Sequence, residues 1–175
     1  MRVVAGSARG RRLRAPVGRS TRPTSDRVRE AVFNMLASRD AVDGATVLDL
    51  FAGTGAMGIE ALSRGASAAT FVESDGAAVE AIRANLALTG LGGGARVVRA
   101  DALLWLEGGG AFDLAFVDPP YGFDGWDRLL RHLDAGRAVL ESDRPVHVAD
   151  PWEAVQDRRY GGTVVTLVHR KKGLV

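Results

Sequence analysis

The chain has 175 residues, of which 46% are hydrophobic and 25% are charged, a composition that fits one globular domain with a well-developed core. It contains no cysteine, which excludes disulfides, thiolate metal sites and a cysteine nucleophile. No apolar run is long enough to span a membrane, and the first residues lack the apolar segment of a signal peptide. We therefore expect a cytoplasmic protein without a membrane partner.

The net charge of +2 conceals a strong asymmetry along the chain. Residues 1–29 contain nine arginines and one acid, whereas the remaining residues contain 14 basic and 20 acidic side chains. A basic segment on an acidic body indicates two different ligands, and guanidinium groups suit the phosphates of a polyanion such as nucleic acid. The alternative interpretation is a solvated segment that only improves solubility.

We expect little regular structure in the basic segment before a helix that begins near residue 25. Short apolar pieces at residues 3–5 and at Leu13 are expected to pair as a small hairpin around residues 6–10. Thr24 or Ser25 can cap a helix that ends near Ser38. The apolar residues that predict this helix by their spacing are Val28, Val32, Met35 and Leu36.

From residue 40 onward, short apolar runs alternate with helical patterns. This alternation predicts an α/β, Rossmann-like fold with a mostly parallel seven-stranded sheet and helices on both faces. The expected strands are 47–51, 69–73, 96–99, 112–117, 138–140, 146–148 and 163–169. The expected helices are 58–64, 77–88, 102–106 and 126–133.

Parallel sheets bind ligands at the carboxyl ends of their strands. The first expected strand is followed by Gly53, Gly55 and Gly58, whose G-x-G-x-x-G spacing permits close approach of the backbone to a ligand. Glu73 ends the second strand 20 residues after Gly53, the spacing at which an acid reaches a pair of ribose hydroxyls. Together they predict a cofactor that carries a nucleoside. The alternative is a tight turn with a surface acid.

Acidic side chains lie at or near the ends of the first four expected strands: Asp49, Glu73, Asp101 and Asp118. They would repel the pyrophosphate of a dinucleotide and favour a cation. S-adenosylmethionine, with its ribose, ammonium and sulfonium, fits this polarity. A magnesium site is the other use of clustered acids, although we expect no metal. Asp101 has a second interpretation, as the N-cap of the helix that follows it.

The fourth expected strand leads directly into Asp118, Pro119, Pro120 and Tyr121. Prolines have no N–H for a sheet ladder, and they stiffen the backbone while leaving carbonyl groups free. A carboxylate and a free carbonyl can accept both hydrogens of an NH2 group, and an aromatic ring can stack on a planar base. This Asp-Pro-Pro-Tyr motif (residues 118–121) therefore predicts a site for the exocyclic amine of a nucleobase.

Residues 47–121 resemble the class I S-adenosylmethionine-dependent methyltransferases, in which such a motif is found in enzymes that methylate adenine N6 or guanine N2. Segments 2–6, 10–13 and 22–34 are similar to the RsmD family, which methylates guanine N2 in bacterial 16S ribosomal RNA. The resemblance spans residues 2–121 almost continuously. It implies an RNA-binding extension over residues 1–39 and a catalytic domain over residues 40–175.

The resemblance also implies roles for matching positions. Asp118 and the Pro119 carbonyl would accept the two N–H bonds of the amine, and Tyr121 would stack on the base. The expected catalytic residues are Asp118, Pro119, Pro120 and Tyr121. Those expected to bind S-adenosylmethionine are Asp49, Ala52, Gly53, Thr54, Gly55, Glu73, Ser74, Asp101 and Ala102. Those expected to bind RNA are Arg2, Arg9, Arg11, Arg12, Arg14, Arg22, Thr24, Arg27 and Arg29.

Other functions remain open from the residues alone. The Asp-Pro-Pro-Tyr motif serves a DNA or RNA adenine-N6 methyltransferase equally well. The glycines and Glu73 also suit a nicotinamide-dependent oxidoreductase, and the basic segment suits a non-catalytic ribosome assembly factor. Our favoured interpretation is a monomer that methylates 16S ribosomal RNA within a small subunit or its precursor, with no functional residue assigned after Tyr121.

Overall fold

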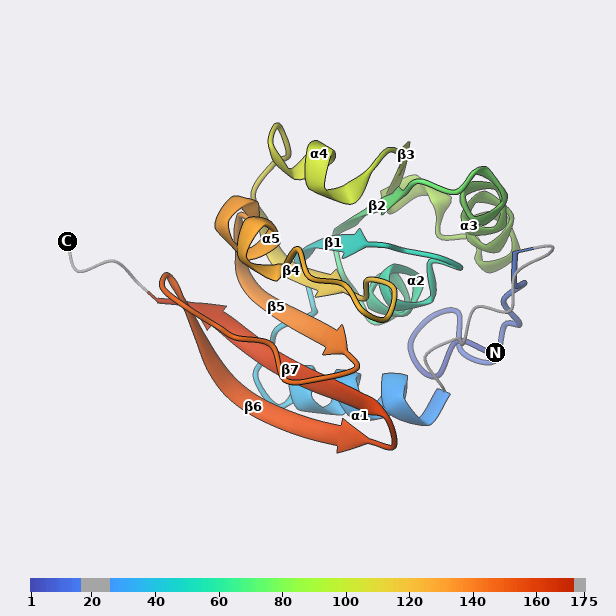
Figure 1. Cartoon of the computed structure of the whole chain (residues 1–175). Coiled ribbons are helices and arrows are strands. Elements are labelled where there is room, and N and C mark those ends of the chain that lie inside the picture. Colours follow the sequence, from blue (N-terminus) through green and yellow to red (C-terminus); the bar gives the residue numbers. More distant parts are fainter. Residues whose placement is uncertain (17–25, 172–175) are drawn as a thin grey trace.

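The computed structural model describes residues 1–16 and 26–171. A seven-stranded sheet, in the order β3-β2-β1-β4-β5-β7-β6, forms the centre of the molecule (Figure 1). The strands are β1 Thr46–Leu50, β2 Ala68–Glu73, β3 Ala95–Arg99, β4 Phe112–Val117, β5 Ala135–Ser142, β6 Trp152–Tyr160 and β7 Thr163–Arg170. The helices are α1 Asp26–Ala37, α2 Ala56–Ser63, α3 Gly76–Thr89, α4 Ala102–Leu106 and α5 Trp126–His132, with a 3-10 turn η1 at Gly92–Gly94.

Five neighbouring strands, β3, β2, β1, β4 and β5, run parallel to one another. Strand β7 pairs antiparallel with both β5 and β6. The predicted α/β, Rossmann-like fold with a mostly parallel seven-stranded sheet is confirmed.

Helices cover both faces of this sheet, which explains why its central strands are continuous apolar runs. Helices α1, α2 and α3 share one hydrophobic core with one face, where Phe33, Ile59 and Phe116 are buried. Helices α4 and α5 pack on the opposite face, where Leu106 and Leu129 are buried. Because these strands are parallel, their carboxyl ends lie along one edge of the sheet, where the following loops begin (Figure 1).

Residues 1–16, here called the basic arm, fold back on themselves and pack onto the domain. An antiparallel bridge joins Arg2 to Arg12, and the amide of Leu13 donates to the carbonyl oxygen of Met1 at 3.1 Å. Val3, Ala8 and Leu13 are buried in the same core as α1 and α2. The predicted boundary at residue 39 therefore does not divide two hydrophobic cores, because the arm and the domain share one.

The strand predicted at residues 146–148 is wrong, because those residues form no regular structure and the sixth strand is β6. Strand β6 lies at the edge of the sheet and is exposed along most of its length, so its polar residues show no alternation of apolar side chains. The caps expected at Thr24 or Ser25 lie outside the described residues. No helix in residues 1–16 and 26–171 is long and apolar enough to cross a membrane.

Candidate active site

The glycine loop (residues 51–55) connects β1 to α2 at the carboxyl edge of the sheet. Gly53 has a φ of +54°, a conformation that glycine adopts without strain. Gly58 serves packing instead, because a Cβ there would lie only 2.4 Å from the ring of Phe71 on β2. The third glycine of the motif thus brings α2 against the sheet, and the first shapes the loop.

Glu73 is half-buried at the end of β2, and its carboxylate faces the glycine loop. One oxygen accepts from the amide of Gly53 at 2.9 Å, and the other accepts from the amide of Asp75 at 2.9 Å. Two backbone donors thus fix the carboxylate, and each oxygen retains a lone pair for a further donor such as a hydroxyl.

Asp49 is buried beneath the same loop, and its carboxylate accepts a hydrogen bond from the amide of Gly58 at 2.9 Å. Burial raises the pKa of Asp49 to about 7, against the opposing effect of the Gly58 hydrogen bond, and the charge of Glu73 adds to the increase. A cation beside Asp49 would offset the cost of burying this carboxylate. The site therefore fits a ligand that carries an ammonium group.

Asp101 lies next to the end of β2, because the amide of Ala100 donates to the carbonyl oxygen of Glu73 at 3.1 Å. Its side chain is exposed and caps α4, accepting from the amide of Leu104 at 3.0 Å. The N-cap interpretation of Asp101 is confirmed, and the cap leaves the second carboxylate oxygen for another donor. Ser74 is exposed beside it, whereas Ala102 is buried.

The Asp-Pro-Pro-Tyr motif leaves the sheet directly beside the glycine loop. Strands β1 and β4 are paired in parallel with Leu50 opposite Val117, so the residues that follow them, Phe51 and Asp118, are neighbours. Asp118 is half-buried and Tyr121 is 58% exposed, which leaves most of the ring open to a ligand. The structure thus brings the two predicted ligand sites together.

An aromatic cluster joins these two loops. The ring of Phe123 lies 5.6 Å from that of Phe51 and 5.3 Å from that of Trp126, both in edge-to-face arrangement. Phe51 has a φ of +57°, which is uncommon for a residue with a bulky side chain and points to a local constraint. Sequence reasoning missed Phe51 and Phe123, because only the fold brings them together.

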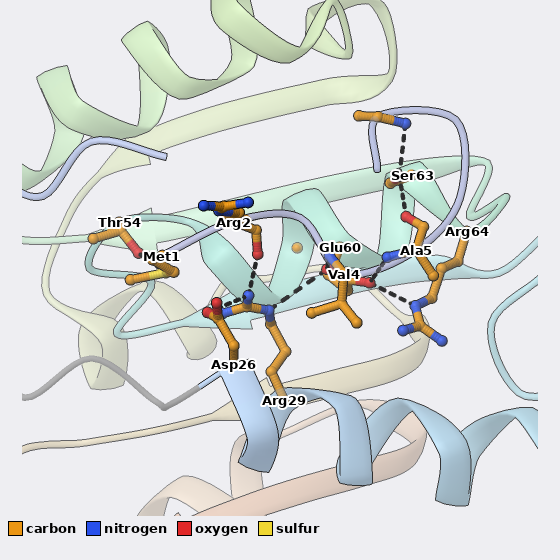
Figure 2. A network of polar contacts seen from close by, with 12 residues as sticks. Met1, Arg2, Val4, Ala5, Asp26, Arg29, Thr54, Glu60, Ser63 and Arg64 are labelled. Atoms are coloured by element: carbon orange, nitrogen blue, oxygen red, sulfur yellow. Dashed lines mark hydrogen bonds and ion pairs between the residues drawn. The ribbon is translucent and has the colours of Figure 1, made fainter. Parts of the chain in front are cut away.

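Buried polar side chains attach the basic arm to α2. Figure 2 shows Glu60 between the arm and two guanidinium groups. Its carboxylate accepts from the amides of Val4 at 2.7 Å and Ala5 at 3.0 Å, and it pairs with Arg64 at 2.7 Å. Glu60 is fully buried, and its hydrogen bonds to Val4 and Ala5 fix the path of the arm over α2.

Arg29 belongs to the same network, and its predicted role in RNA binding is wrong. The residue is fully buried, and its Nε lies 3.5 Å from Glu60 (Figure 2). Its Nη2 atom donates to Asp26 at 2.9 Å and to the carbonyl oxygen of Arg2. Arg22 and Thr24 lie outside the described residues. The other arginines predicted to bind RNA are exposed: Arg2, Arg9, Arg11, Arg12, Arg14 and Arg27.

Asn85 of α3 connects the basic arm to the glycine loop. This buried side chain donates to the carbonyl oxygens of Thr54 and Arg14, each at 3.0 Å. Its Oδ1 atom accepts from the amide of Arg14 at 2.7 Å. The arm and the loop are therefore held by one side chain. Among the described residues, no group of three or more His, Asp or Glu side chains could hold a metal ion.

Comparisons with known proteins agree with this geometry. A family model described as "Conserved hypothetical protein 95" matches residues 1–169. A putative rRNA methyltransferase YlbH of Bacillus subtilis is 40% identical, over 99% of this chain and 100% of its own length. Ribosomal RNA small subunit methyltransferase D of Escherichia coli K12 is 46% identical, over 69% of this chain and 60% of its own length. The chain belongs to the RsmD family of methyltransferases.

Solved structures support membership of the RsmD family along the whole chain. A putative methyltransferase, yhhF, from Escherichia coli superposes with a TM-score of 0.87 at 36% identity, covering 98% of each chain. A hypothetical protein of Thermus thermophilus superposes with a TM-score of 0.81 at 36% identity, covering 97% of this chain and 99% of its own.

As a member of the RsmD family, the protein requires a methyl donor.

The residues that the fold adds to the predicted site are Glu60 and Asn85, which hold the basic arm, and Phe51 and Phe123, which join the two loops. The only sequence signal for Glu60 and Asn85 is a polar residue among apolar neighbours of a helix, such as Ile59 and Leu86.

Proposed function

We propose that this protein transfers a methyl group from S-adenosylmethionine to the N2 amine of a guanine in small-subunit (16S) ribosomal RNA. The observation that carries the proposal is the parallel pairing of β1 with β4, which places Leu50 opposite Val117. Because of this register, a donor held at the glycine loop and a base held at the Asp-Pro-Pro-Tyr motif would be neighbours. In this proposal residues 40–175 perform the reaction and residues 1–39 contact the RNA.

The acids around the glycine loop support S-adenosylmethionine as the donor. Glu73, fixed by two backbone amides, would bind the ribose hydroxyls, and the exposed Asp101 would approach the adenine amine. Asp49, whose pKa is raised to about 7 by burial, would be stabilised in its ionised form by the ammonium group. S-adenosylmethionine supplies an electrophilic methyl group on a sulfonium when it is bound.

The Asp-Pro-Pro-Tyr motif would activate the amine by hydrogen bonding. An aryl amine is a poor nucleophile because its lone pair is delocalised into the ring, and positive charge develops on the nitrogen during transfer. Asp118 and the Pro119 carbonyl would accept the two N–H bonds and favour the charged, pyramidal nitrogen. Tyr121, a residue that is 58% exposed, would stack on a base that has left its helix.

Ribosomal RNA as the substrate is supported by the names of the relatives and by the exposed arginines of the basic arm. Guanine is favoured over adenine because segments 2–6, 10–13 and 22–34 resemble the RsmD family. Mass mapping of methylated nucleotides in 16S ribosomal RNA, from cells with and without this protein, tests the proposal. We expect one N2-methylguanosine to disappear. Loss of an N6-methyladenosine, or no loss, would contradict it.

A further inference from the structure

The turn between β6 and β7 lies at the ligand-binding edge of the sheet. Strand β7 is antiparallel to β5, and β6 is antiparallel to β7, so β6 runs in the same direction as the parallel strands. The carboxyl end of β6, at residues 158–160, therefore lies at the same edge as the Asp-Pro-Pro-Tyr motif (Figure 1). This part of the chain had no role in the site predicted from the sequence.

A direct contact joins this turn to the motif. The hydroxyl oxygens of Tyr121 and Thr163 lie 3.4 Å apart, and either group can donate. Thr163 is the first residue of β7 and pairs with Tyr160, the last residue of β6. The turn thus flanks the exposed ring of Tyr121.

Three exposed arginines lie at this edge of the sheet, and because successive side chains of a strand point to opposite faces, Arg158 and Arg159 flank the edge on both faces. Arg158 and Arg159 end β6, and Arg144 follows β5, with its Nη2 atom 3.4 Å from the carbonyl oxygen of Phe123. None of the three forms an ion pair within residues 1–16 and 26–171. Some exposed arginines elsewhere on the body are paired with acids, as in Arg83 with Glu80, Arg128 with Glu107 and Arg170 with Asp134.

The acids near the turn do not cancel these charges. Asp143 is engaged by the amide of Gly122, which donates to its carboxylate at 3.2 Å. Asp157 is exposed on β6, where it pairs with Thr166 across the ladder, one position before Arg158. These acids offset part of the positive charge, but within residues 1–16 and 26–171 neither Asp143 nor Asp157 forms an ion pair with the three guanidinium groups, which can therefore bind another anion.

We propose that Arg144, Arg158 and Arg159 bind phosphates of the RNA strand beside the target nucleotide. This inference rests on the proposed RNA substrate. The basic arm is attached to α2 and α3, on the β1 side of the motif, whereas the β6–β7 turn lies on the β5 side. Extruding a base costs a few kcal/mol, so holding the backbone on both sides of it would keep the nucleotide in the pocket.

An RNA strand fits this surface better than an acidic protein does. Single-stranded nucleic acid is bound by a basic groove that follows its backbone together with aromatic rings on which bases stack. The guanidinium groups and the exposed ring of Tyr121 supply both features at one edge. Arginine also binds phosphate through two parallel hydrogen bonds, which favours it over a single point charge.

The test compares Arg158→Ala/Arg159→Ala with a matched control, Arg96→Ala/Arg131→Ala. The control removes two exposed arginines, one on β3 and one at the last turn of α5. Binding to deproteinised 16S ribosomal RNA is measured against salt concentration. We expect affinity to fall about tenfold, and the slope of log affinity against log salt to decrease by about 1.4, in the first variant only.

Cofactor affinity should stay within about twofold of wild type in both double variants, since neither removes a residue of the glycine loop. An equal loss in the control, or unchanged RNA affinity in Arg158→Ala/Arg159→Ala, would overturn the inference. Unchanged affinity for protein-free RNA is also the result expected if these arginines bound a ribosomal protein. If the wild type binds and methylates RNA and Arg158→Ala/Arg159→Ala binds RNA with the same affinity, only this inference fails. If the wild type neither binds nor methylates RNA, the proposed function fails as well.

Discussion

The side-chain amide of Asn85 donates a hydrogen bond to the carbonyl oxygen of Thr54, at 3.0 Å and 31 positions away in the chain. The same side chain accepts from and donates to the backbone of Arg14. One buried residue of α3 therefore sets the position of both the glycine loop and the basic arm. The arm packs into the core of the protein through Val3, Ala8 and Leu13, so the backbone that carries its exposed arginines follows a fixed path.

We predict that Asn85→Ala weakens cofactor binding and RNA binding together, because it removes the bonds to Thr54 and to Arg14. Leaving those buried backbone groups unsatisfied should also lower the free energy of unfolding by about 1–3 kcal/mol. Calorimetric titration with S-adenosylmethionine and anisotropy with labelled RNA measure the two affinities. Ser63→Ala is the matched control, because within the described part of the chain the Ser63 side chain bonds only Ala5 and Ala8 of the arm. It should affect RNA alone, and equal effects of both variants on the cofactor would contradict the assignment.

Glu60→Gln should destabilise the fold strongly. The substitution removes the buried charged partner of Arg29 and leaves it paired with the half-exposed Asp26, and breaking a buried ion pair in this way costs about 3–5 kcal/mol. Urea unfolding measures the loss. Glu80→Gln is the control, because Glu80 pairs with Arg83 on the exposed face of α3 and should give no measurable change. Similar midpoints for the two variants would show that the Glu60 network does not hold the arm.

The affinity for S-adenosylmethionine should increase as the pH rises from about 6 to 8. Burial raises the pKa of Asp49 to about 7, so in this range the carboxyl becomes ionised and can attract the ammonium group. Calorimetric titration across the range measures the effect. Asp49→Asn has no charge to gain, so its affinity should be lower at pH 8 and should not change with pH. A pH-dependent increase that survives in Asp49→Asn would assign it to another group.

The same residue predicts a pH dependence of stability. The pKa of Asp49 is raised in the folded protein from its usual 3.8 to about 7, so between these values the unfolded chain releases a proton that the folded protein retains. The stability of the cofactor-free protein should therefore fall as the pH rises through this window, by on the order of 4 kcal/mol. Urea unfolding at pH 5 and pH 8 measures the part of this decrease that lies above pH 5, about 3 kcal/mol, which should be smaller in Asp49→Asn. An identical decrease in that variant would exclude Asp49 as the cause.

Asp118→Ala should leave cofactor affinity unchanged and slow methyl transfer roughly a hundredfold or more, the usual consequence of removing a group that stabilises charge in the transition state. Single-turnover transfer and equilibrium binding separate the two effects. Asp124→Ala is the matched control, since Asp124 is an exposed acid three positions after Tyr121. A normal rate in Asp118→Ala would remove the central residue of the mechanism.

The sequence predicted most of the sheet and the acids at its strand ends because alternating apolar runs and strand-end acids are local patterns. Asp49, Glu73 and Asp118 therefore emerged before the fold was known. Strand β6 was not predicted, because an exposed edge strand needs no apolar face and resembles a polar loop.

Buried polar residues were the other failure of prediction. Arg29 was assigned to RNA because it lies among arginines, although Val32, Phe33 and Leu36 follow it at helical spacing on the buried face of α1. That spacing could have indicated burial. Its partner Glu60 is on another helix, and a contact of this kind is decided by packing that no local pattern encodes.

In the reaction that we propose, the Asp-Pro-Pro-Tyr motif presents a guanine amine to a donor at the glycine loop. The most direct test is single-turnover transfer of a labelled methyl group from S-adenosylmethionine to small ribosomal subunits from cells that lack this protein, followed by mass analysis of the nucleosides. The account predicts label in N2-methylguanosine with the wild type and almost none with Asp118→Ala. Label in N6-methyladenosine, or equal labelling by the two proteins, would contradict it.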